Sequence, residues 1–269
     1  MRIAGCVPAY NNESTIAAAI ASLKAQTIPL DDIFVVDDGS TDSTAKVAME
    51  AGARVVSMES NQGRGAARAK AIEETQADLL LSVDGTNALA PDFLAKSLPW
   101  FEDSSVAAVY GRITQSSPKT SVDRWRGRHL YKLDEVPGSG VSEHLSSWGF
   151  AQRVALIAAI GNFNSSCRHS EDAELGKRLS SRGYKIIYEP QAILTTLTSN
   201  TLKQVFERYW RWNQATDGKS SLRSFAKFWW YSLKVLALRD VKRGDLLSAL
   251  YSALLPYYCA YRSAKDGSK

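Results

Sequence analysis

The stretch VVDDGSTD, residues 35–42, ends a short apolar run in a turn that carries three aspartates. The stretch LLLSVDGT, residues 79–86, likewise ends an apolar run in Asp84. Apolar runs of this length are typical of buried strands. Carboxylates that directly follow such strands are expected at the strand ends, where open α/β sheets place their ligand sites. A third acidic cluster, SEDAEL, follows at residues 170–175.

Short apolar runs alternate with helical patterns around these clusters. Strands are expected at residues 3–7, 33–36, 54–57, 79–83, 106–110, 148–152 and 185–188, and helices at 15–23, 41–51, 65–75, 154–159 and after Asp172. Pro91 is expected to open a further helix at its favoured first-turn position. The alternation predicts an α/β fold with a mostly parallel sheet and crossover helices.

Two regions depart from this alternation. Residues 114–147 are polar and basic, contain several glycines, and are expected to form a long loop that is either functional or disordered. From Thr201 onward the pattern is helical and interleaves aromatic and leucine side chains with Lys and Arg. No apolar run there reaches the roughly 20 residues that a spanning helix needs. This tail is therefore expected either to lie on a membrane surface or to pack on its own domain.

The charge of the chain is unevenly distributed. Residues 203–269 hold 13 Lys and Arg against 5 Asp and Glu, a net +8, so the preceding residues carry −3 of the total +5. A basic tail favours an anionic partner surface. We expect membrane phospholipid and no nucleic acid, because the sequence has no zinc-finger spacing, RNP-like aromatic motif or leucine zipper.

Length and composition fit one sizeable α/β domain with a helical appendage. The three cysteines are widely separated and odd in number, which indicates neither a disulfide framework nor a clustered metal site. The N-terminus enters a strand and turns polar too soon for a signal peptide. We therefore expect a cytoplasmic protein, peripheral at the inner face of the membrane.

Several short motifs follow one another in a particular order. They are VPAYN (7–11), DDGS (37–40), NQG (61–63) with Ala67-Arg68, Asp84 with PDFL (91–94), GFA (149–151) and ED (171–172). Over residues 1–212 the chain resembles the family 2 inverting glycosyltransferases, which have the GT-A fold of nucleotide-diphospho-sugar transferases. The resemblance implies a Rossmann-like GT-A domain at 1–200, with a nucleotide-binding half at about 1–112 and an acceptor half at about 113–200. The basic, aromatic-rich helical region is then 201–269.

The resemblance also implies a set of residues that bind a nucleotide-diphosphate sugar, with UDP as the expected nucleotide. They are Pro8, Ala9, Tyr10, Asn11, Asp37, Asp38, Arg68, Asp84 and Gly85. An ionised carboxylate at a strand end suits hydroxyl and imide donors, because it only accepts hydrogen bonds. The residues alone also allow purely structural roles. Tyr10 could be a half-buried aromatic residue of the turn, and Asp42 could cap a helix.

Asp84 matches the first acid of the family's Asp-X-Asp metal motif. The resemblance implies that it holds Mg²⁺ or Mn²⁺ against the diphosphate, which suits hard oxygen ligands. The second acidic position is Thr86, whose neutral hydroxyl would weaken the site, and Asn87 could assist through its carbonyl.

Asp172 matches the position of the family's catalytic base, and Glu171 would orient that base or meet the sugar. General-base help of this kind typically contributes a rate factor of roughly 10²–10⁴. Alternatively, Ser170 caps a helix whose first turn favours acids, and both descriptions can hold together.

Residues 208–212, RYWRW, resemble the family's Gln-X-X-Arg-Trp element, with Arg208 in the place of glutamine. The resemblance implies that Arg208, Arg211 and Trp212 lie near the diphosphate or the acceptor. The departure argues against processive polymer synthesis, and Trp212 could equally be a packing residue.

The implied reaction is sugar transfer to the hydroxyl of a sugar or lipid-linked acceptor, in surface polysaccharide or glycolipid synthesis. A Rossmann oxidoreductase fits poorly, because Arg68 stands where the third glycine of that fingerprint belongs. A sugar nucleotidyltransferase would need a Gly-rich basic loop after the first strand. A catalytically weakened nucleotide-sugar-binding regulator or scaffold is the other alternative; Thr86 motivates it and Asp172 opposes it.

Overall fold

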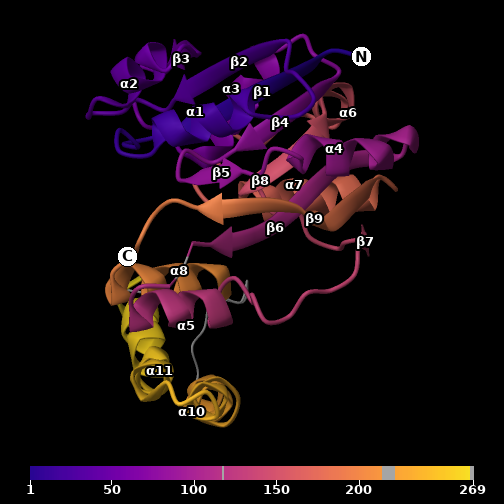
Figure 1. Cartoon of the computed structure of the whole chain (residues 1–269). Helices are drawn as coiled ribbons and strands as arrows, with labels where there is room; N and C mark the ends of the chain where they lie inside the picture. Colours follow the sequence, from indigo (N-terminus) through magenta and orange to yellow (C-terminus); the bar gives the residue numbers. More distant parts are fainter. Residues whose placement is uncertain (117, 214–221, 267–269) are drawn as a thin grey trace. The chain divides into compact units, whose positions relative to one another are not determined.

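The computed structural model describes residues 1–116, 118–213 and 222–266 (Figure 1). The chain forms two compact units: unit 1 is Met1–Ser116 with Val136–Thr198, and unit 2 is Ser117–Glu135 with Ser199–Lys269. The domain boundary expected at residue 200 stays a prediction. Residues 117–135, which we placed in the acceptor half, nevertheless join the C-terminal helices in unit 2.

Unit 1 is built on one mixed sheet. Its strands are β1 Ile3–Ala9, β2 Asp32–Asp37, β3 Arg54–Ser57, β4 Leu79–Val83, β5 Asn87–Leu89, β6 Val106–Gln115, β7 Gly140–Val141, β8 Gly149–Arg153 and β9 Lys185–Thr196. Their spatial order is β3-β2-β1-β4-β8-β6-β9-β5, with β7 paired to β9. Strands β1 to β4 are parallel to one another, whereas β8 runs antiparallel to both β4 and β6. The α/β prediction is confirmed.

Helices cover this sheet on both faces. They are α1 Ile16–Lys24, α2 Thr44–Glu50, α3 Arg64–Glu73, α4 Phe93–Ser97, the 3-10 helix η1 Leu98–Glu102, α6 Val154–Ala159 and α7 Glu171–Ser181. Side chains of α3, α6 and α7 form one core cluster with alternate strand residues such as Cys6, Phe34 and Phe150. On the other face α1 approaches so closely that a Cβ at Gly5 would lie 3.2 Å from the Leu23 side chain. Truncating the fully buried Phe34 to alanine would cost about 3–5 kcal/mol of stability.

Two local expectations are wrong, and a third holds only in part. Pro91 precedes the helix instead of opening it, because α4 begins at Phe93 and the Pro91 carbonyl accepts a hydrogen bond from Thr27. Residues 114–147 are not one loop, because Thr120 and Asp123 form a reciprocal capping box that starts a helix. Ser170 does hold the N-cap position of α7, whose first turn carries acids as expected, but its side chain makes no capping hydrogen bond and its backbone is left-handed with φ of 60°.

Unit 2 is helical, as the sequence predicts. Its helices are α5 Ser121–His129, α8 Leu202–Asn213, α9 Leu222–Tyr231, the π-helix η2 Ser232–Ala237, α10 Leu238–Val241 and α11 Leu246–Asp266. The buried Trp125 lies at their centre: its indole N–H donates to Ser252 at 2.8 Å, and its ring contacts Phe206 and Tyr209. Among the described helices, none combines the length and apolarity that crossing a membrane requires.

Candidate active site

The carboxyl ends of β1, β2 and β4 surround a cavity of about 300 Å³ in unit 1. It is lined by Pro8, Ala9, Tyr10, Asn12, Asp38, Asn61, Gly63, Arg64, Ala67, Arg68, Asp84, Gly85, Thr86, Arg168 and His169. The structure therefore brings together most of the residues for which nucleotide-sugar binding was predicted. Tyr10 is 43% exposed at this wall, so it is available as a flat contact surface.

Asn11 and Asp37 do not line the cavity, although the sequence placed them with its binding residues. Asp37 is buried and accepts hydrogen bonds from the backbone and hydroxyl of Ser40. The Asn11 side chain accepts from the Thr41 backbone at 2.9 Å. Both side chains hold the turn after β2, in which Gly39 has a φ of +66°. The glycine is required there because L side chains rarely adopt this conformation.

Asp38 joins that turn to the loop before α3. Its carboxylate accepts from the backbone N–H groups of Gln62 at 2.7 Å and Gly63 at 2.9 Å, and from the Asn61 amide at 2.8 Å. Burial raises the pKa of Asp38, and the Gln62 and Gly63 N–H groups partly offset that rise. Asp38 is therefore a buried residue that lines the cavity and fixes the shape of its wall.

Arg68 is the centre of a buried ion network beside the cavity. Its guanidinium donates to Asp84 at 2.5 Å, to Glu171 at 3.1 Å and to the Ser147 carbonyl at 2.9 Å. Burial lowers the pKa of Arg68, but the charges of Asp84 and Glu171 outweigh it, so that the net pKa is raised. The network links the end of β4 and the middle of α3 to the start of α7 and compensates the charge of the buried Glu171.

Asp172 reaches the same network through Ser147. It accepts from the Ser147 hydroxyl at 2.9 Å, and its other carboxylate oxygen accepts from the Ala173 backbone at 2.8 Å. Ser147 in turn lies 3.4 Å from Glu171. Glu171 is almost completely buried, whereas Asp172 is partly exposed. Of the two acids, Asp172 is the one that an incoming group can reach.

The cavity provides only some of the oxygen ligands that a divalent cation requires. Asp84 keeps 16% of its side chain exposed and has one oxygen engaged by Arg68. Thr86 lines the cavity beside it, while the Asn87 amide N–H₂ donates to the Trp148 carbonyl. Among the described residues no group of three or more His, Cys, Asp or Glu is arranged for a metal. One carboxylate still fits Mg²⁺, since this ion commonly takes one or two carboxylates together with substrate phosphates.

Three further basic side chains line the cavity: Arg64, which the sequence allows equally as a surface charge; Arg168, which no motif indicated; and His169, an outside candidate because it adjoins Glu171 and Asp172. Arg64 begins α3, and Arg168 and His169 come from the loop before α7. Arg168 donates to the backbone and side chain of Asn61. Only the adjacency of Arg168 and His169 to the acidic cluster at 170–175 hinted at them in the sequence.

The remaining predicted residues belong to unit 2. Arg208, Arg211 and Trp212 all lie on α8. Arg208 donates to the Tyr131 hydroxyl at 3.2 Å, and its guanidinium lies 5.8 Å from the Trp212 ring centre. Trp212 also lines a second cavity of about 400 Å³ within this unit, together with Arg128, Lys132, Tyr209 and Tyr231 among others.

Comparisons with known proteins agree with this architecture. Residues 6–161 match the family model of glycosyl transferase family 2, and residues 144–264 match that of glycosyl transferase family 21. The chain belongs to glycosyl transferase family 2.

Individual relatives are distant. An N-acetylglucosaminyltransferase of Sinorhizobium fredii is 23% identical over 231 residues, which is 78% of this chain and 56% of the relative. The chain thus spans about half the length of the curated relatives that it matches.

Two solved structures show the fold. A mannosyltransferase from Pyrobaculum calidifontis in complex with GDP-Man and Mn²⁺ superposes with a TM-score of 0.64 at 17% identity, covering 98% of this chain and 87% of that one. S. aureus TarS 1-349 in complex with UDP-GlcNAc gives 0.60 at 16% identity, covering 99% and 92%. The GT-A fold expected from the sequence is confirmed.

Proposed function

We propose that this chain is an inverting glycosyltransferase that moves a sugar from a UDP-sugar to a hydroxyl acceptor. The observation that carries the proposal is the Arg68 network, which joins the cavity wall at Asp84 to the acids at the start of α7. A donor bound in the cavity would therefore have its diphosphate near Asp84 and its sugar toward Ser147 and Asp172.

The nucleotide would occupy the part of the cavity between Tyr10 and Asp38. Tyr10 offers a ring face for the base, and Asp38 offers carboxylate oxygens to imide or ribose hydroxyl donors. S. aureus TarS was solved with UDP-GlcNAc and the Pyrobaculum calidifontis mannosyltransferase with GDP-Man, so the fold accepts both nucleotides; we propose UDP, the nucleotide that the sequence resemblance implies. Pro8, Ala9 and Gly85 would supply close backbone surfaces.

The diphosphate would be neutralised by a divalent cation and by arginine side chains. Asp84, with Thr86 beside it, would hold Mg²⁺ or Mn²⁺, and the ion would offset the charge that develops on the leaving diphosphate. Arg64 and Arg168 line the same cavity and would add positive charge there. Arg208 and Arg211 stay candidates for the diphosphate or the acceptor, with Trp212.

Asp172 would act as the general base. It takes the proton from the acceptor hydroxyl while that oxygen forms its bond to the anomeric carbon, and the bond from this carbon to the diphosphate breaks on the opposite face. Glu171, held by Arg68, would keep the start of α7 and hence Asp172 in place. Base assistance of this kind corresponds to a rate factor of roughly 10²–10⁴.

The acceptor would be a sugar or a lipid-linked sugar used for surface polysaccharide or glycolipid, reached at the cytoplasmic face of a membrane. The alternative, a nucleotide-sugar-binding regulator with weakened catalysis, is favoured by one observation: the Asp84 carboxylate lacks a second acidic partner and is engaged by Arg68.

The test compares released UDP from a panel of UDP-sugars, with and without Mn²⁺, for wild type, Asp172→Asn and Glu174→Gln. Glu174 lies on the same helix and pairs with Arg178, so it controls for changes in α7. We expect turnover to fall at least 100-fold in Asp172→Asn and to stay within threefold in Glu174→Gln. If the wild type bound donor but released no UDP, even with lipid-linked acceptors present, the result would favour the nucleotide-sugar-binding regulator over the transferase.

A further inference from the structure

Helix α11 has an unusual distribution of side chains. Its exposed side carries Leu246, Leu250, Leu254, Tyr257 and Tyr261, which recur every three or four residues and therefore form one stripe. Its buried side carries Ser248, Ser252 and a single leucine, Leu255, all completely inaccessible. A helix that only packed on its own protein would turn its leucines inward.

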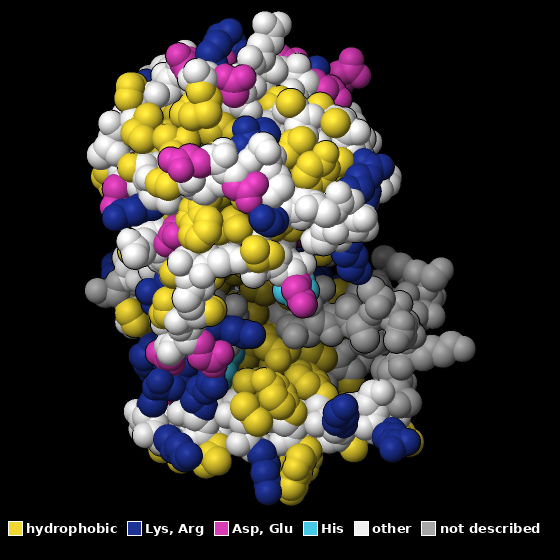
Figure 2. Space-filling model, turned by 90° about the vertical axis from the view of Figure 1, so that its right-hand side faces the viewer, with side chains coloured by type: hydrophobic (Ala, Val, Ile, Leu, Met, Phe, Trp, Pro, Cys, Tyr) yellow, Lys and Arg dark blue, Asp and Glu magenta, His cyan; other side chains and the backbone are white. Residues whose placement is uncertain are grey.

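The elements that adjoin α11 extend the stripe. Large apolar side chains are exposed on α9, η2 and α10 at Trp230, Tyr231, Val235, Leu238 and Val241. The α11 stripe is continuous with α9, since the Trp229 indole donates to the Tyr257 hydroxyl at 3.1 Å. Figure 2 shows hydrophobic side chains gathered with Lys and Arg on the visible face of this unit. We name these five residues and the α11 stripe the docking face.

The charges around the docking face are positive. Lys227, Lys234 and Lys242 are exposed, and the Lys234 ammonium lies 4.4 Å from the Trp230 ring centre. From residue 222 to 265 the only carboxylates are Asp240 and Asp245.

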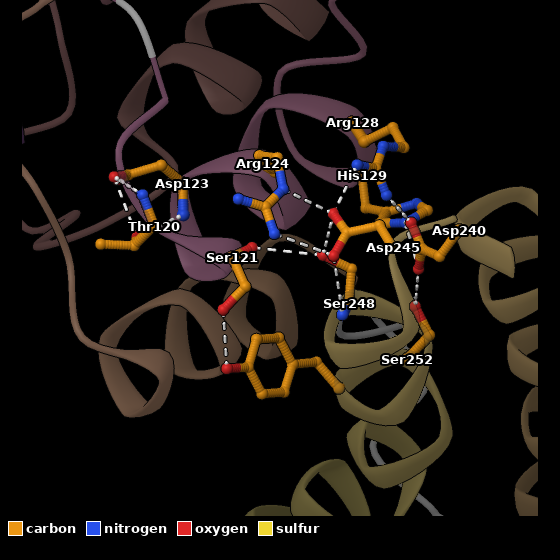
Figure 3. A network of polar contacts seen from close by, with 11 residues as sticks. Thr120, Ser121, Asp123, Arg124, Arg128, His129, Asp240, Asp245, Ser248 and Ser252 are labelled. Carbon is orange, nitrogen blue, oxygen red and sulfur yellow. Dashed lines mark hydrogen bonds and ion pairs between the residues drawn. The ribbon is translucent and has the colours of Figure 1, made fainter. Parts of the chain in front are cut away.

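Both carboxylates are turned inward and neutralised (Figure 3). Asp240 binds Arg128, His129 and Ser252, and Asp245 binds Arg124, Arg128 and Ser248. Arg239 and Arg243 pair with Glu135 and Asp134 of the same unit, so Arg223 and the three lysines are the exposed cations that remain for a partner among described residues 222–264.

We propose that the docking face binds the surface of an anionic phospholipid membrane. Aromatic and leucine side chains interleaved with lysine are typical of helices that lie in a lipid interface. A second copy of this chain is a poorer occupant, because two such faces would bring like charges together. The inference deepens the proposed function and rests on it only for the biological use of the surface, which is access to a lipid-linked acceptor.

The test is cosedimentation of the full chain with vesicles of phosphatidylcholine alone or with 30% phosphatidylglycerol, at 0.1 and 0.5 M NaCl. The apolar variant is Leu246→Gln/Leu250→Gln/Leu254→Gln, and the charge variant is Lys227→Gln/Lys234→Gln/Lys242→Gln. The matched control is Met49→Gln/Val141→Gln, which removes exposed apolar side chains from unit 1. Circular dichroism confirms that each variant is folded.

We expect binding to anionic vesicles that falls on the order of 100-fold in the charge variant, because each lysine contributes roughly fivefold near such a surface. The apolar variant should lose at least tenfold, the control less than twofold, and 0.5 M salt should weaken wild-type binding.

Equal binding by the apolar variant and wild type would overturn the proposal. The absence of wild-type binding to either kind of vesicle would also overturn it. So would a dimeric wild-type protein that becomes monomeric in the apolar variant, because the docking face would then be a subunit interface. UDP release is measured without vesicles in parallel, so that a failure of docking is distinguished from a failure of the glycosyltransferase proposal.

Discussion

Each unit buries an arginine between carboxylates, yet the two clusters differ in what surrounds them. In unit 1, Arg68 lies between Asp84 and Glu171, and both Arg68 and Asp84 line the candidate active-site cavity. In unit 2, Asp240 is completely buried and is bonded from several sides by Arg128, His129 and Ser252. The same side-chain chemistry thus prepares a charged site in unit 1 and joins helices in unit 2.

The first and largest expected effect comes from Arg68→Met. The variant leaves Glu171 buried without its countercharge, which should cost about 3–5 kcal/mol of stability. It also releases Asp84 and the α7 start, so UDP release should be lost. Urea denaturation and the UDP assay measure the two effects.

The control for this prediction is Arg64→Met, which removes a cavity-lining arginine without a buried partner. It should reduce donor affinity while changing stability by less than 1 kcal/mol. If Arg68→Met had nearly wild-type stability, the Arg68 cluster of unit 1 would contribute no more to the free energy of unfolding than an exposed ion pair does.

Asp240→Ala is expected to have the next largest effect. It leaves His129 without its carboxylate and Arg128 with Asp245 as its remaining partner, and the loss should approach 3 kcal/mol for unit 2. Hydrogen exchange should speed up in α5 and α11, while donor binding by unit 1 stays within twofold. Slow exchange in both helices would show that the cluster does not join them.

The sequence predicts the parts of these clusters that are local, and it does not predict contacts between residues that are far apart along the chain. The strand ends at Asp38 and Asp84 are visible because apolar runs stop there. Motif order located Arg68 and Asp172 but could not show that Ser147 connects Asp172 to the network, because that contact closes a long segment between β8 and α7.

Unit 2 was less predictable for the same reason. The basic stretch around Arg128 reads as a loop until Asp240 and Asp245, more than a hundred residues later, provide its countercharges. Helix α11 reads as amphipathic, but the sequence alone could not indicate that serines occupy its buried side, because the partners of Ser252, Trp125 and Asp240, and the partner of Ser248, Asp245, are known only from the fold.

A smaller effect is expected from Asp38→Asn. The amide keeps one acceptor but presents N–H₂ to the Gln62 or Gly63 N–H groups, which costs about 1–3 kcal/mol for an unsatisfied buried group. Donor affinity should fall about 10-fold as the cavity wall shifts, as measured by calorimetry with UDP. Asp42→Asn at the α2 start, where Asp42 accepts from Thr44, is the control and should leave UDP affinity unchanged.

The smallest expected effect is on acid stability, to which Asp245 of unit 2 and Asp38 of unit 1 should contribute in opposite directions. Hydrogen bonds from Arg124 and Arg128 hold the pKa of Asp245 below its usual range against the effect of burial. That stabilisation is present above the unfolded pKa of about 3.9 and is lost as pH falls toward the folded value. Burial instead raises the pKa of Asp38, so protonation of this one carboxyl in acid contributes in favour of the folded state.

Five of the seven tryptophans lie in unit 2, so tryptophan fluorescence follows mainly that unit during urea unfolding. Between pH 5 and pH 3 its free energy of unfolding should fall by about 1 kcal/mol from Asp245 alone. The Asp245→Asn variant should start from lower stability and lose less over the same interval, because it has no carboxylate to protonate there. Parallel pH curves for wild type and variant would mean that the Arg124 and Arg128 contacts contribute little to unit 2, and that its helices are held by packing around Trp125.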